Sequence, residues 1–495
     1  MKIRYALWIT AFLTFLNIHA PAATLYVSLA STNPVPPYAD WSTAATNIQD
    51  AVDASTNGDL ILVTNGVYAT GGRTWYGQGG TNRVTLTNAV TLQSINGPAV
   101  TLIVGSQVAG AGTAVTNAVR CVLMGNNAVL SGFTLTNGEA GSAEVPVGGG
   151  GVVFGNRFGV GTVTNCVLIG NLVPDSYGGG AYFVALINCQ IVGNHALYGG
   201  GAYGGTLNAC TVSNNTALNG GGVYSATLTN CILCNNSAVN IGGGAAGSIL
   251  ANCTVVSNSA NEGGGISYLT SPFTLANCVV YYNTAQIGAN YYNLGTLNYC
   301  CTTPFPSGGF GNITNEPAFA NLPNSDFHLQ SISSCINSGN NAYVTSATDL
   351  DGNPRIVGGT VDIGAYEYQT PVSQISYAWL DQYGLPITAG IDTSDLDGTG
   401  FTVYQDWIAG LNPTNALSIL AMLTPIPTNN PAGLVVSWQS VSNITYFLQS
   451  STNLGMQPAF STIQSNLVGQ AGTTSYTDTS AVGSGPYFYR VGVQQ

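Results

Sequence analysis

The chain has very little charge. Only 6% of its 495 residues are charged, Lys2 is its single lysine, and it has three histidines. Without residues 1–22, six arginines and 20 acids remain, and the net charge is 6 − 20 = −14. Nucleic acids and anionic membranes bind basic surfaces, so we expect neither as a partner. Low charge combined with 45% hydrophobic residues argues for an ordered chain and against a disordered one.

Long apolar runs are also missing, except at the N-terminus. Lys2 and Arg4 precede an apolar run over residues 5–18 and the small-residue site Ala20-Pro21-Ala22, which is typical of a secretory signal peptide cut before Ala23. We therefore expect residues 1–22 to be removed and the protein to be secreted, extracellular or on the outer cell surface, as a monomer. No second run is long enough for a transmembrane helix.

A helix-long apolar stripe is absent from the centre of the chain, which instead holds a repeat. Residues 178–283 contain five units that each open on a glycine triplet, with a period of 21 or 22 residues. A short fixed period is the signature of a solenoid. Runs such as CTVVSN leave room for two or three short strands in each unit. The pattern predicts one coil of a parallel β-helix per unit, and not a leucine-rich repeat, which needs helix formers on its return leg.

Each coil carries a cysteine and, five residues later, an asparagine. Coils stack about 4.8 Å apart, so side chains at the same position form ladders. We interpret the asparagines as left-handed bend residues whose amides bond the coils above and below, and the cysteines as an inward stack of thiols. Disulfides are the alternative, disfavoured because one ladder takes one cysteine per coil and the total of 11 is odd. The ladder residues are Cys166, Cys189, Cys210, Cys231, Cys253 and Cys278 with Asn171, Asn194, Asn215, Asn236, Asn258 and Asn283.

The segments on either side of the repeat predict caps and a second domain. Ala44, Ile48, Ala51 and Val52 recur at helical spacing and indicate a short helix that caps the first coil. Alternating strands after residue 420 predict a small β-sandwich, with Trp438 and Tyr487 to Tyr489 in its core. We expect a β-helix over 23–369 (N-terminal cap 23–83, coils 84–303, C-terminal cap 304–369), a linker over 370–420 and the sandwich over 421–495.

The repeat resembles that of bacterial polymorphic outer-membrane proteins, on the right-handed, pectin-lyase-like β-helix fold. PPYADWSTAATNIQDAVDA and GDLILVTNGVY are similar to the N-terminal cap of that group. DFHLQSISSCINSGNN and DLDGNPRIVGGTVDIGAYEY resemble the ending known as choice-of-anchor Q, and the last segment resembles a fibronectin type III module. These resemblances imply an all-β chain with a right-handed parallel β-helix and export, since members of the group are mostly surface or secreted proteins without a proven reaction.

Residues 395–406 match a calcium loop of the EF-hand type. The ligand positions 1, 3, 5, 7 and 12 fall on Asp395, Asp397, Thr399, the carbonyl of Phe401 and Asp406. Thr399 and Asp406 depart from the usual acid and the usual bidentate glutamate, so we expect modest affinity. The loop resembles those of thrombospondin type 3 and dockerin-like repeats, which implies one structural calcium ion that stiffens the linker. A turn without metal is the alternative.

Arg355 lies among several acids and is predicted to form a bidentate pair with Asp362 and Glu367 that fixes the C-terminal cap. A polysaccharide-cleaving site built on these three residues is the alternative. Arginine is protonated at any ordinary pH, so it is a poor base.

Tyrosines follow the glycine triplets and predict either an aromatic strip that stacks on sugar rings or an ordinary packing stack. They are Tyr182, Tyr203, Tyr224 and Tyr268. Glycoside hydrolysis needs two nearby carboxylates, and Asp175 and Glu262 are four coils apart.

We therefore expect a non-catalytic protein of surface adhesion or glycan binding, with a polysaccharide or cell-surface glycan as its partner. Two alternatives stay open. One is a polysaccharide lyase or glycoside hydrolase with its site on the early coils, near Arg73, Arg83, Arg120 and Glu139. The other is a purely structural component of an envelope or matrix.

Overall fold

The computed structural model describes residues 22–75, 78–108, 118–140, 148–154, 161–268, 274–292, 295–429 and 432–494. Residues 1–21 of the predicted signal peptide lie outside these ranges. Contacts divide the chain into an N-terminal unit, residues 1–174 with 180–185, and a C-terminal unit, residues 175–179 with 186–495. Among the described residues, no helix is long and apolar enough to span a membrane.

The N-terminal unit begins with the predicted helix. Helix α1 (Ile48–Ala54) starts at Asn47, whose side chain accepts from the backbone N–H of Gln49, and buries Ile48, Ala51 and Val52. The short helix expected from the sequence is therefore confirmed. It packs against β1, β2 and β5.

Parallel strands build the rest of this unit. Strands β1, β2, β6, β9 and β12 form one sheet, and β3, β7, β10 and β13 form a second. In the third sheet, β5, β8, β11 and β15 are parallel and β4 pairs with β5 in the antiparallel sense. The strands are β1 (Thr24–Val27), β2 (Leu60–Val63), β3 (Gly66–Tyr68), β4 (Arg73–Trp75), β5 (Gln78–Leu86), β6 (Thr91–Ser94), β7 (Thr101–Val104), β8 (Val119–Met124), β9 (Val129–Ser131), β10 (Thr134–Thr136), β11 (Val152–Phe154), β12 (Thr162–Thr164), β13 (Val167–Ile169) and β15 (Ala181–Tyr182). Strands β14 (Leu172–Tyr177) and β16 (Ala185–Ile187) lie at the boundary between the units.

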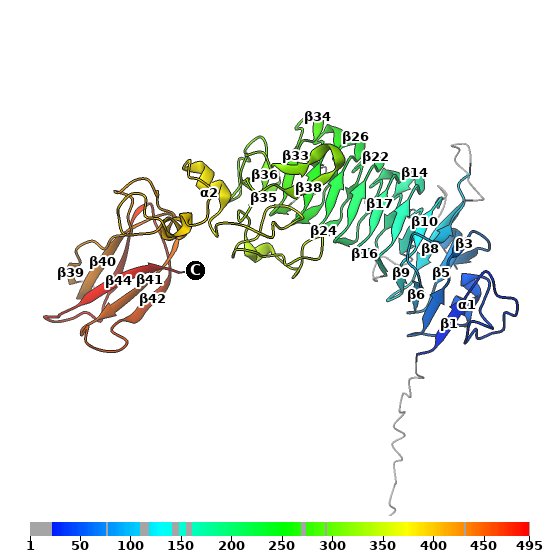
Figure 1. The fold of residues 1–495 in the computed structure, drawn as a ribbon, viewed down its shortest axis with the longest axis horizontal. Coiled ribbons are helices and arrows are strands. Elements are labelled where there is room, and N and C mark those ends of the chain that lie inside the picture. The colour runs from blue at the N-terminus through cyan, green and yellow to red at the C-terminus, as the bar shows by residue number, and fades with distance from the viewer. Residues whose placement is uncertain are drawn as a thin grey trace, which may run out of the picture. The chain divides into compact units, whose positions relative to one another are not determined.

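In the C-terminal unit each coil contributes one strand to each of four parallel sheets, so the expected two or three strands per coil is too few. The additional strand has two residues and directly follows the glycine triplet. The sheets are β20-β24-β28-β32-β35, β17-β21-β25-β29-β33-β36, β19-β23-β27-β31 and β18-β22-β26-β30-β34. This pairing defines a parallel β-helix, as the sequence predicts (Figure 1).

The strands of these coils have two to five residues each. They are β17 (Gln190–Val192), β18 (His195–Tyr198), β19 (Ala202–Tyr203), β20 (Thr206–Asn208), β21 (Thr211–Ser213), β22 (Thr216–Asn219), β23 (Val223–Tyr224), β24 (Thr227–Thr229), β25 (Ile232–Cys234), β26 (Ser237–Ile241), β27 (Ala245–Ala246), β28 (Ile249–Ala251), β29 (Thr254–Val256), β30 (Ser259–Glu262), β31 (Ile266–Ser267), β32 (Thr274–Ala276), β33 (Val279–Tyr281), β34 (Thr284–Ile287), β35 (Thr296–Asn298) and β36 (Cys301–Thr302).

The asparagine ladder is continuous through this unit. The side-chain amide of Asn215 donates to Oδ1 of Asn236 at 2.9 Å, and Asn236 repeats the contact to Asn258 at 2.9 Å. Asn258 bonds Asn283 in the same way, and Asn283 bonds Asn290, which closes the row on the carbonyl of Thr303. In the N-terminal unit, Asn171 donates to the carbonyl of Leu135. Each ladder side chain is buried, so each hydrogen bond is made away from water.

The left-handed residues are not the ladder asparagines, which corrects the bend interpretation. Positive φ falls on the residue before each one, as at Asn214 (57°) and Asn235 (56°), and on the residue before each cysteine, as at Asn230 (51°) and Asn252 (52°). The bend therefore comes one residue earlier. It turns the following asparagine inward, where its amide reaches the coils on either side.

All eleven cysteines are buried thiols outside any disulfide. In the thiol row, the backbone N–H of Cys210 donates to Sγ of Cys231 at 3.4 Å, and that of Cys231 donates to Sγ of Cys253 at 3.4 Å. The ladder is thus a stack of thiols. Cys301 differs from its neighbour Cys300, because its side chain lies in the cluster that holds Cys335.

The segment after the last coil covers a side of the stack. Only its beginning continues the stack, through the bridge from Cys301 to Ile313 and the bond from Asn312 to the carbonyl of Leu297 at 2.8 Å. The outer faces of β25, β29 and β33 carry Ile232, Val256 and Val279, which pack against later residues of the same cluster. Those residues are Phe319, Phe327, Leu329, Cys335, Ile336, Ile363, Ala365, Ile375, Tyr377 and Leu380.

The C-terminal end of the chain forms two antiparallel sheets, β39-β40-β43 and β42-β41-β44. Trp438, Tyr446, Val436 and Leu448 form their shared core. Trp438 is fully buried and Tyr489 packs against this core, as expected for Trp438 and for residues 487–489, but Phe488 is 37% exposed. Tyr446 fills a core position that the sequence did not predict.

The remaining elements of the C-terminal unit have three to nine residues each. The strands are β37 (Phe319–Asn321), β38 (Asp326–Leu329), β39 (Ile426–Asn429), β40 (Ala432–Ser440), β41 (Thr445–Ser451), β42 (Ser461–Val468), β43 (Gly472–Asp478) and β44 (Phe488–Val493). The helices are α2 (Tyr377–Gln382) and α3 (Val403–Ala409), with 3-10 turns η1 (Leu322–Asn324), η2 (Asn341–Tyr343) and η3 (Ile391–Thr393).

Candidate functional site

Arg355 and its acids form a buried network. Nη1 of Arg355 contacts Oε2 of Glu367 at 3.2 Å, a single contact where the sequence suggested a bidentate pair. Nη2 donates to the carbonyls of Gly364 at 2.6 Å and Asp362 at 3.3 Å. The Asp362 carboxylate instead accepts the backbone N–H groups of Asn337 and Tyr368. Arg355 also bonds Oδ1 of Asn252, which ties this segment to the coils.

Burial dominates the electrostatics of the network. It raises the pKa of Glu367 to about 9, with the Asp362 charge as a second cause, and it raises the pKa of Asp362 to about 7. Arg355, Asp362 and Glu367 are 1%, 0% and 4% exposed. A polymer cannot reach groups buried to this extent, so the network fixes the fold and does not support the cleavage alternative built on it.

The basic residues of the early coils bond to the protein itself. Arg73 pairs with Asp53 at the surface. Arg83 donates to the carbonyls of Gly71 and Val104, and Arg120 is fully buried and donates to the carbonyl of Gly148. Glu139 is 3% exposed and accepts the backbone N–H of Val108. These four residues therefore hold loops to the coils, which disfavours the alternative that places a catalytic site on them.

Two of the four tyrosines after the glycine triplets, Tyr203 and Tyr224, form a packing stack. The rings of Tyr203 and Tyr224 are parallel within 3° and 5.4 Å apart, and Tyr177 and Tyr198, from β14 and β18, lie against them at 4.6 Å and 5.5 Å. Rings that stack on each other cover their own faces, so this cluster is a poor sugar platform in its middle. Tyr182 is 3% exposed. In the next two coils, the position of Tyr224 is taken by Ala246 and then by Ser267. Tyr268 follows Ser267 and therefore lies one residue beyond the row of tyrosines.

The predicted calcium loop has an acidic turn followed by α3. Asp395 accepts the backbone N–H of Gly398 at 2.8 Å and of Gly400 at 2.9 Å, and Asp397 accepts the hydroxyl of Thr399 at 2.8 Å. Oδ2 of Asp397 and Oδ1 of Asp406 are buried, and neither has a hydrogen-bond partner among the described residues.

These carboxylates are not gathered around one point. Burial raises the pKa of Asp406 to about 6, and the charges of Asp397 and Asp395 contribute. Within the described part of the chain, no three Asp, Glu, His or Cys side chains are placed to hold one metal ion. The two unpaired oxygens, Oδ2 of Asp397 and Oδ1 of Asp406, are the groups that a cation bound at this loop would contact.

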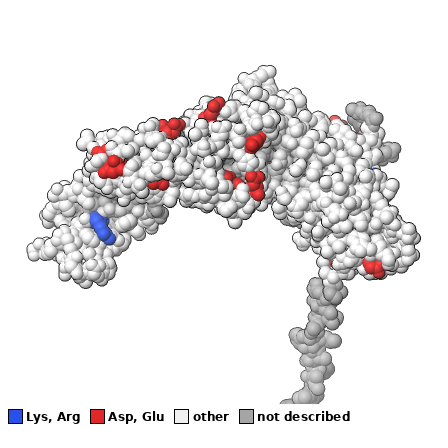
Figure 2. Space-filling model, in the orientation of Figure 1, with Lys and Arg blue, Asp and Glu red and all other residues white. Residues whose placement is uncertain are grey.

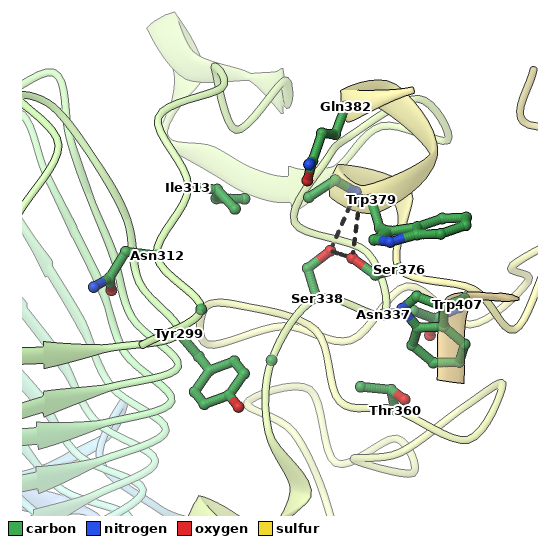
Figure 3. A pocket seen from close by; sticks show the side chains of 13 residues that line it. Tyr299, Asn312, Ile313, Asn337, Ser338, Thr360, Ser376, Trp379, Gln382 and Trp407 are labelled. Atoms are coloured by element: carbon green, nitrogen blue, oxygen red, sulfur yellow. Dashed lines mark hydrogen bonds between the residues drawn. The ribbon is translucent and has the colours of Figure 1, made fainter. Parts of the chain in front are cut away.

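A pocket of about 290 Å³ opens beside the end of the β-helix (Figure 3). Its aromatic lining residues are Tyr299, which follows β35, Trp379 on α2 and Trp407 on α3. A second ring contacts each of them: Tyr343 at 6.3 Å, Tyr383 at 4.9 Å and Tyr404 at 5.6 Å. The rings are therefore held in place before any ligand arrives.

Two serines fix the position of α2 at this pocket. Oγ of Ser338 lies 2.7 Å from Oγ of Ser376, the N-cap of α2, and Ser376 accepts the backbone N–H of Trp379 at 3.3 Å (Figure 3). Thr360 and Gln382 also line the pocket, and neither side chain makes a hydrogen bond to a described residue. A ligand can thus find aromatic rings together with an unengaged hydroxyl and an unengaged amide.

The pocket has no charged lining residue. Its thirteen lining residues include no Asp, Glu, Lys, Arg or His. The face drawn in Figure 2 is mostly uncharged as well, with a few acidic side chains and one basic patch. A charged ligand group would be buried here without a partner, which is costly, so the site favours a neutral ligand.

Sequence reasoning missed this pocket. A signal was present, because Trp379 and Trp407 stand on either side of the acidic loop and two of the six tryptophans of the chain thus fall in one linker. No sequence pattern indicates that these two tryptophans share a pocket with Tyr299, which is 80 residues before Trp379 in the chain.

Comparisons with known proteins give distant structural likenesses. No protein-family model matches the chain, and no curated protein matches it either. Among solved structures, pectate lyase Pel9A has a TM-score of 0.44 at 12% identity and covers 70% of this chain and 97% of its own. A rhamnogalacturonan lyase has 0.39 at 10% identity (74% and 100%), and pectin methylesterase PemA from Erwinia chrysanthemi has 0.32 at 12% (58% and 92%). At these TM-scores we draw no conclusion about activity, and the fold class rests on the strand pairing itself.

Proposed function

We propose that the chain is an exported, non-catalytic glycan-binding protein that takes an uncharged sugar residue in the pocket lined by Trp379, Trp407 and Tyr299. The observation that carries the proposal is the combination of three held aromatic rings with no charged group in a hollow of about 290 Å³. Sugar rings present C–H faces that pack on aromatic rings and hydroxyls that need polar partners. Thr360 and Gln382 supply the polar partners.

The size of the pocket limits the ligand. Sites for drug-sized ligands span about 300–1,000 Å³, so a hollow of about 290 Å³ suits a single sugar residue. A uronic acid is disfavoured, because its carboxylate would find no cation among the lining residues. We therefore assign a neutral pyranose, as a monosaccharide or as one residue of a longer glycan.

Export and the module assignments belong to the same proposal. The signal peptide pattern supports secretion or an outer cell-surface location. The resemblance of the repeat, of the anchor-type ending and of the final module to surface proteins supports a role in adhesion, with the β-helix as a rigid shaft and the pocket as its sugar contact.

The test is a binding panel read by isothermal titration calorimetry. Glucose, galactose, mannose and N-acetylglucosamine are compared with galacturonate, on the wild-type protein and on Trp379→Ala. We expect at least one neutral sugar to bind at about millimolar Kd, which corresponds to about −4 kcal/mol, and galacturonate to bind at least about tenfold more weakly. Trp379→Ala should lose the binding.

Trp41→Ala is the matched control, since Trp41 is 43% exposed on the N-terminal unit and packs on Tyr26 at 4.5 Å. Absence of binding by every neutral sugar, or equal loss in the control, contradicts the proposal. Release of new reducing ends from a panel of uronic-acid or sulfated polysaccharides contradicts its non-catalytic part.

A further inference from the structure

Two further hollows lie next to the sugar pocket. The first hollow, of about 310 Å³, is lined by residues 357–358 and 369–374 and by Asp392. The second hollow, of about 600 Å³, has Gln374 and Asp392 in its lining as well, together with Tyr404 on α3. Because the two linings share Gln374 and Asp392, the hollows meet at these two residues.

The first hollow adjoins the sugar pocket at Gly358. A Cβ on Gly358 would lie 3.2 Å from Nδ2 of Asn337, which lines the pocket, and 3.0 Å from Cγ of Pro371, which lines the hollow. Asn337 also donates to the carbonyl of Ser373, another lining residue of the hollow, at 2.7 Å. Asn337 therefore stands at the boundary between the pocket and the first hollow (Figure 3).

The second hollow adjoins the pocket at helix α3. Tyr404 lines the hollow and Trp407 lines the pocket, and the two residues are three positions apart on the helix. Residues at this spacing are neighbours on a helix surface, and the two ring centroids are 5.6 Å apart. Aromatic surface therefore continues from the pocket into the second hollow.

The two hollows combine apolar and polar surface. Val372, which is 50% exposed, and Pro371 give the first hollow apolar faces, and Tyr404 gives the second an aromatic one. Gln374 is exposed at the place where the hollows meet, and its side-chain amide makes no hydrogen bond to a described residue. Apolar faces beside a few unengaged polar groups suit the C–H faces and the hydroxyls of sugar residues.

Asp392 makes the shared edge of the two hollows negative. Its carboxylate accepts the hydroxyl of Ser373 at 2.5 Å and the backbone N–H of Gln374 at 2.9 Å. A carboxylate has about four acceptor positions, so about two remain for donors of a ligand. Among the described residues, no Lys, Arg or His lines either hollow. The edge therefore favours hydroxyl groups and repels a second carboxylate or a sulfate.

We propose that the pocket is one part of a longer site, in which a neutral glycan chain of at least three sugar residues runs from the pocket through the first hollow into the second. Gln374 and Asp392 bind hydroxyls of the chain where the hollows meet. The inference rests on the proposed function and deepens it, because it selects an oligosaccharide over a monosaccharide as the ligand.

The test compares sugar chains of different length by isothermal titration calorimetry. Glucose is paired with cellotriose and maltotriose, mannose with mannotriose, and N-acetylglucosamine with N,N′,N″-triacetylchitotriose, and trigalacturonate is the anionic probe. A trisaccharide offers three residues to one pocket, so a gain of up to about threefold arises by statistics alone. We expect at least one neutral trisaccharide to bind at least about tenfold more tightly than its monosaccharide, and trigalacturonate to show no such gain.

Two variants test the residues where the hollows meet. Gln374→Ala and Asp392→Asn should each reduce the ratio of trisaccharide to monosaccharide affinity at least about threefold. Gln374 is exposed, so Gln374→Ala keeps the test valid should Asp392→Asn fail to fold. Gln286→Ala is the matched control and should keep the ratio, because Gln286 is an exposed glutamine on β34 outside all three linings.

The outcomes separate this inference from the proposed function. Monosaccharides that bind through Trp379, with no trisaccharide gaining more than about threefold, overturn the inference and leave the proposed function in place. A gain that both variants keep, or an equal gain for trigalacturonate, also overturns the inference. Trisaccharide binding that Gln374→Ala weakens and Trp379→Ala does not leaves the two hollows as sugar sites and refutes the proposed pocket. Absence of binding by every saccharide refutes both.

Discussion

The side-chain amide of Asn236 donates to Oδ1 of Asn258 at 2.9 Å, and the backbone N–H of Asn236 donates to the same oxygen at 2.9 Å. Oδ1 of Asn258 thus accepts hydrogen bonds from both the backbone and the side chain of the ladder asparagine in the neighbouring coil. Asn236 also donates to the carbonyl of Val212 in the coil before it. One buried residue therefore joins three consecutive coils.

Asn236→Ala should destabilise the protein by about 3 kcal/mol, because it leaves the buried N–H of Asn215 and other ladder groups without partners, at about 1–3 kcal/mol each. Asn240→Ala, which changes an exposed residue of β26, the strand that follows Asn236, should stay within about 0.5 kcal/mol of the wild type. Urea unfolding of both variants measures the difference. Equal stabilities would show that the ladder does not hold the coils together.

The glycine triplet leaves no room for a side chain. A Cβ on Gly221 would lie 2.4 Å from the carbonyl oxygen of Ser237 and 2.5 Å from that of Gly243, both backbone atoms that cannot turn away. Gly221→Ala should therefore cost about 3 kcal/mol or prevent folding. Gly308→Ala, where nothing lies within 4 Å, should be neutral. Soluble yield and thermal melting of the two variants measure the difference. A stable Gly221→Ala protein would contradict the claim that this corner has no room for a side chain.

The Arg355 network should make stability fall as pH rises. The pKa of Asp362 and of Glu367 is raised above the unfolded value, so their contribution is fully present below about pH 4 and is lost as the pH passes about 7 and about 9. Glu367→Gln should flatten the decline of the unfolding free energy between pH 5 and pH 9. The slope is the readout, since the amide changes the absolute stability as well. Asp175→Asn should keep the wild-type slope, and an unchanged slope in Glu367→Gln would contradict the assignment.

The thiols should be unreactive in the native protein. Burial raises the pKa of Cys234 to about 11 and that of Cys121 to about 12, and it shields all eleven sulfurs. Iodoacetamide at pH 8, followed by mass spectrometry, should label almost none natively and eleven after denaturation without reductant. Fewer than eleven labels in the denatured protein would reveal disulfides and contradict the thiol ladder.

The sequence by itself determined the coil. A fixed period with glycine, cysteine and asparagine at constant offsets is a local statement, because each coil contacts mainly its neighbours and like residues meet by repetition. The repeat also indicates which face of the coils is covered. The outward positions change from polar, as in TVS over 211–213, to apolar, as in ILC over 232–234 and VVY over 279–281, which marks the face that the later segment covers.

Only the tertiary structure decided what the non-repeating part does. The left-handed bend residue precedes the ladder asparagine by one position. Only the backbone dihedral angles reveal this offset, because the composition of the coil is the same either way. Arg355 meets Asn252, and Trp379 and Trp407 meet Tyr299, across 80 to 108 residues of chain. No period relates such residues, so their meeting depends on how one irregular segment packs along the stack. The sequence thus determined the β-helix, whereas the pocket beside it depends on the tertiary packing of the irregular segment.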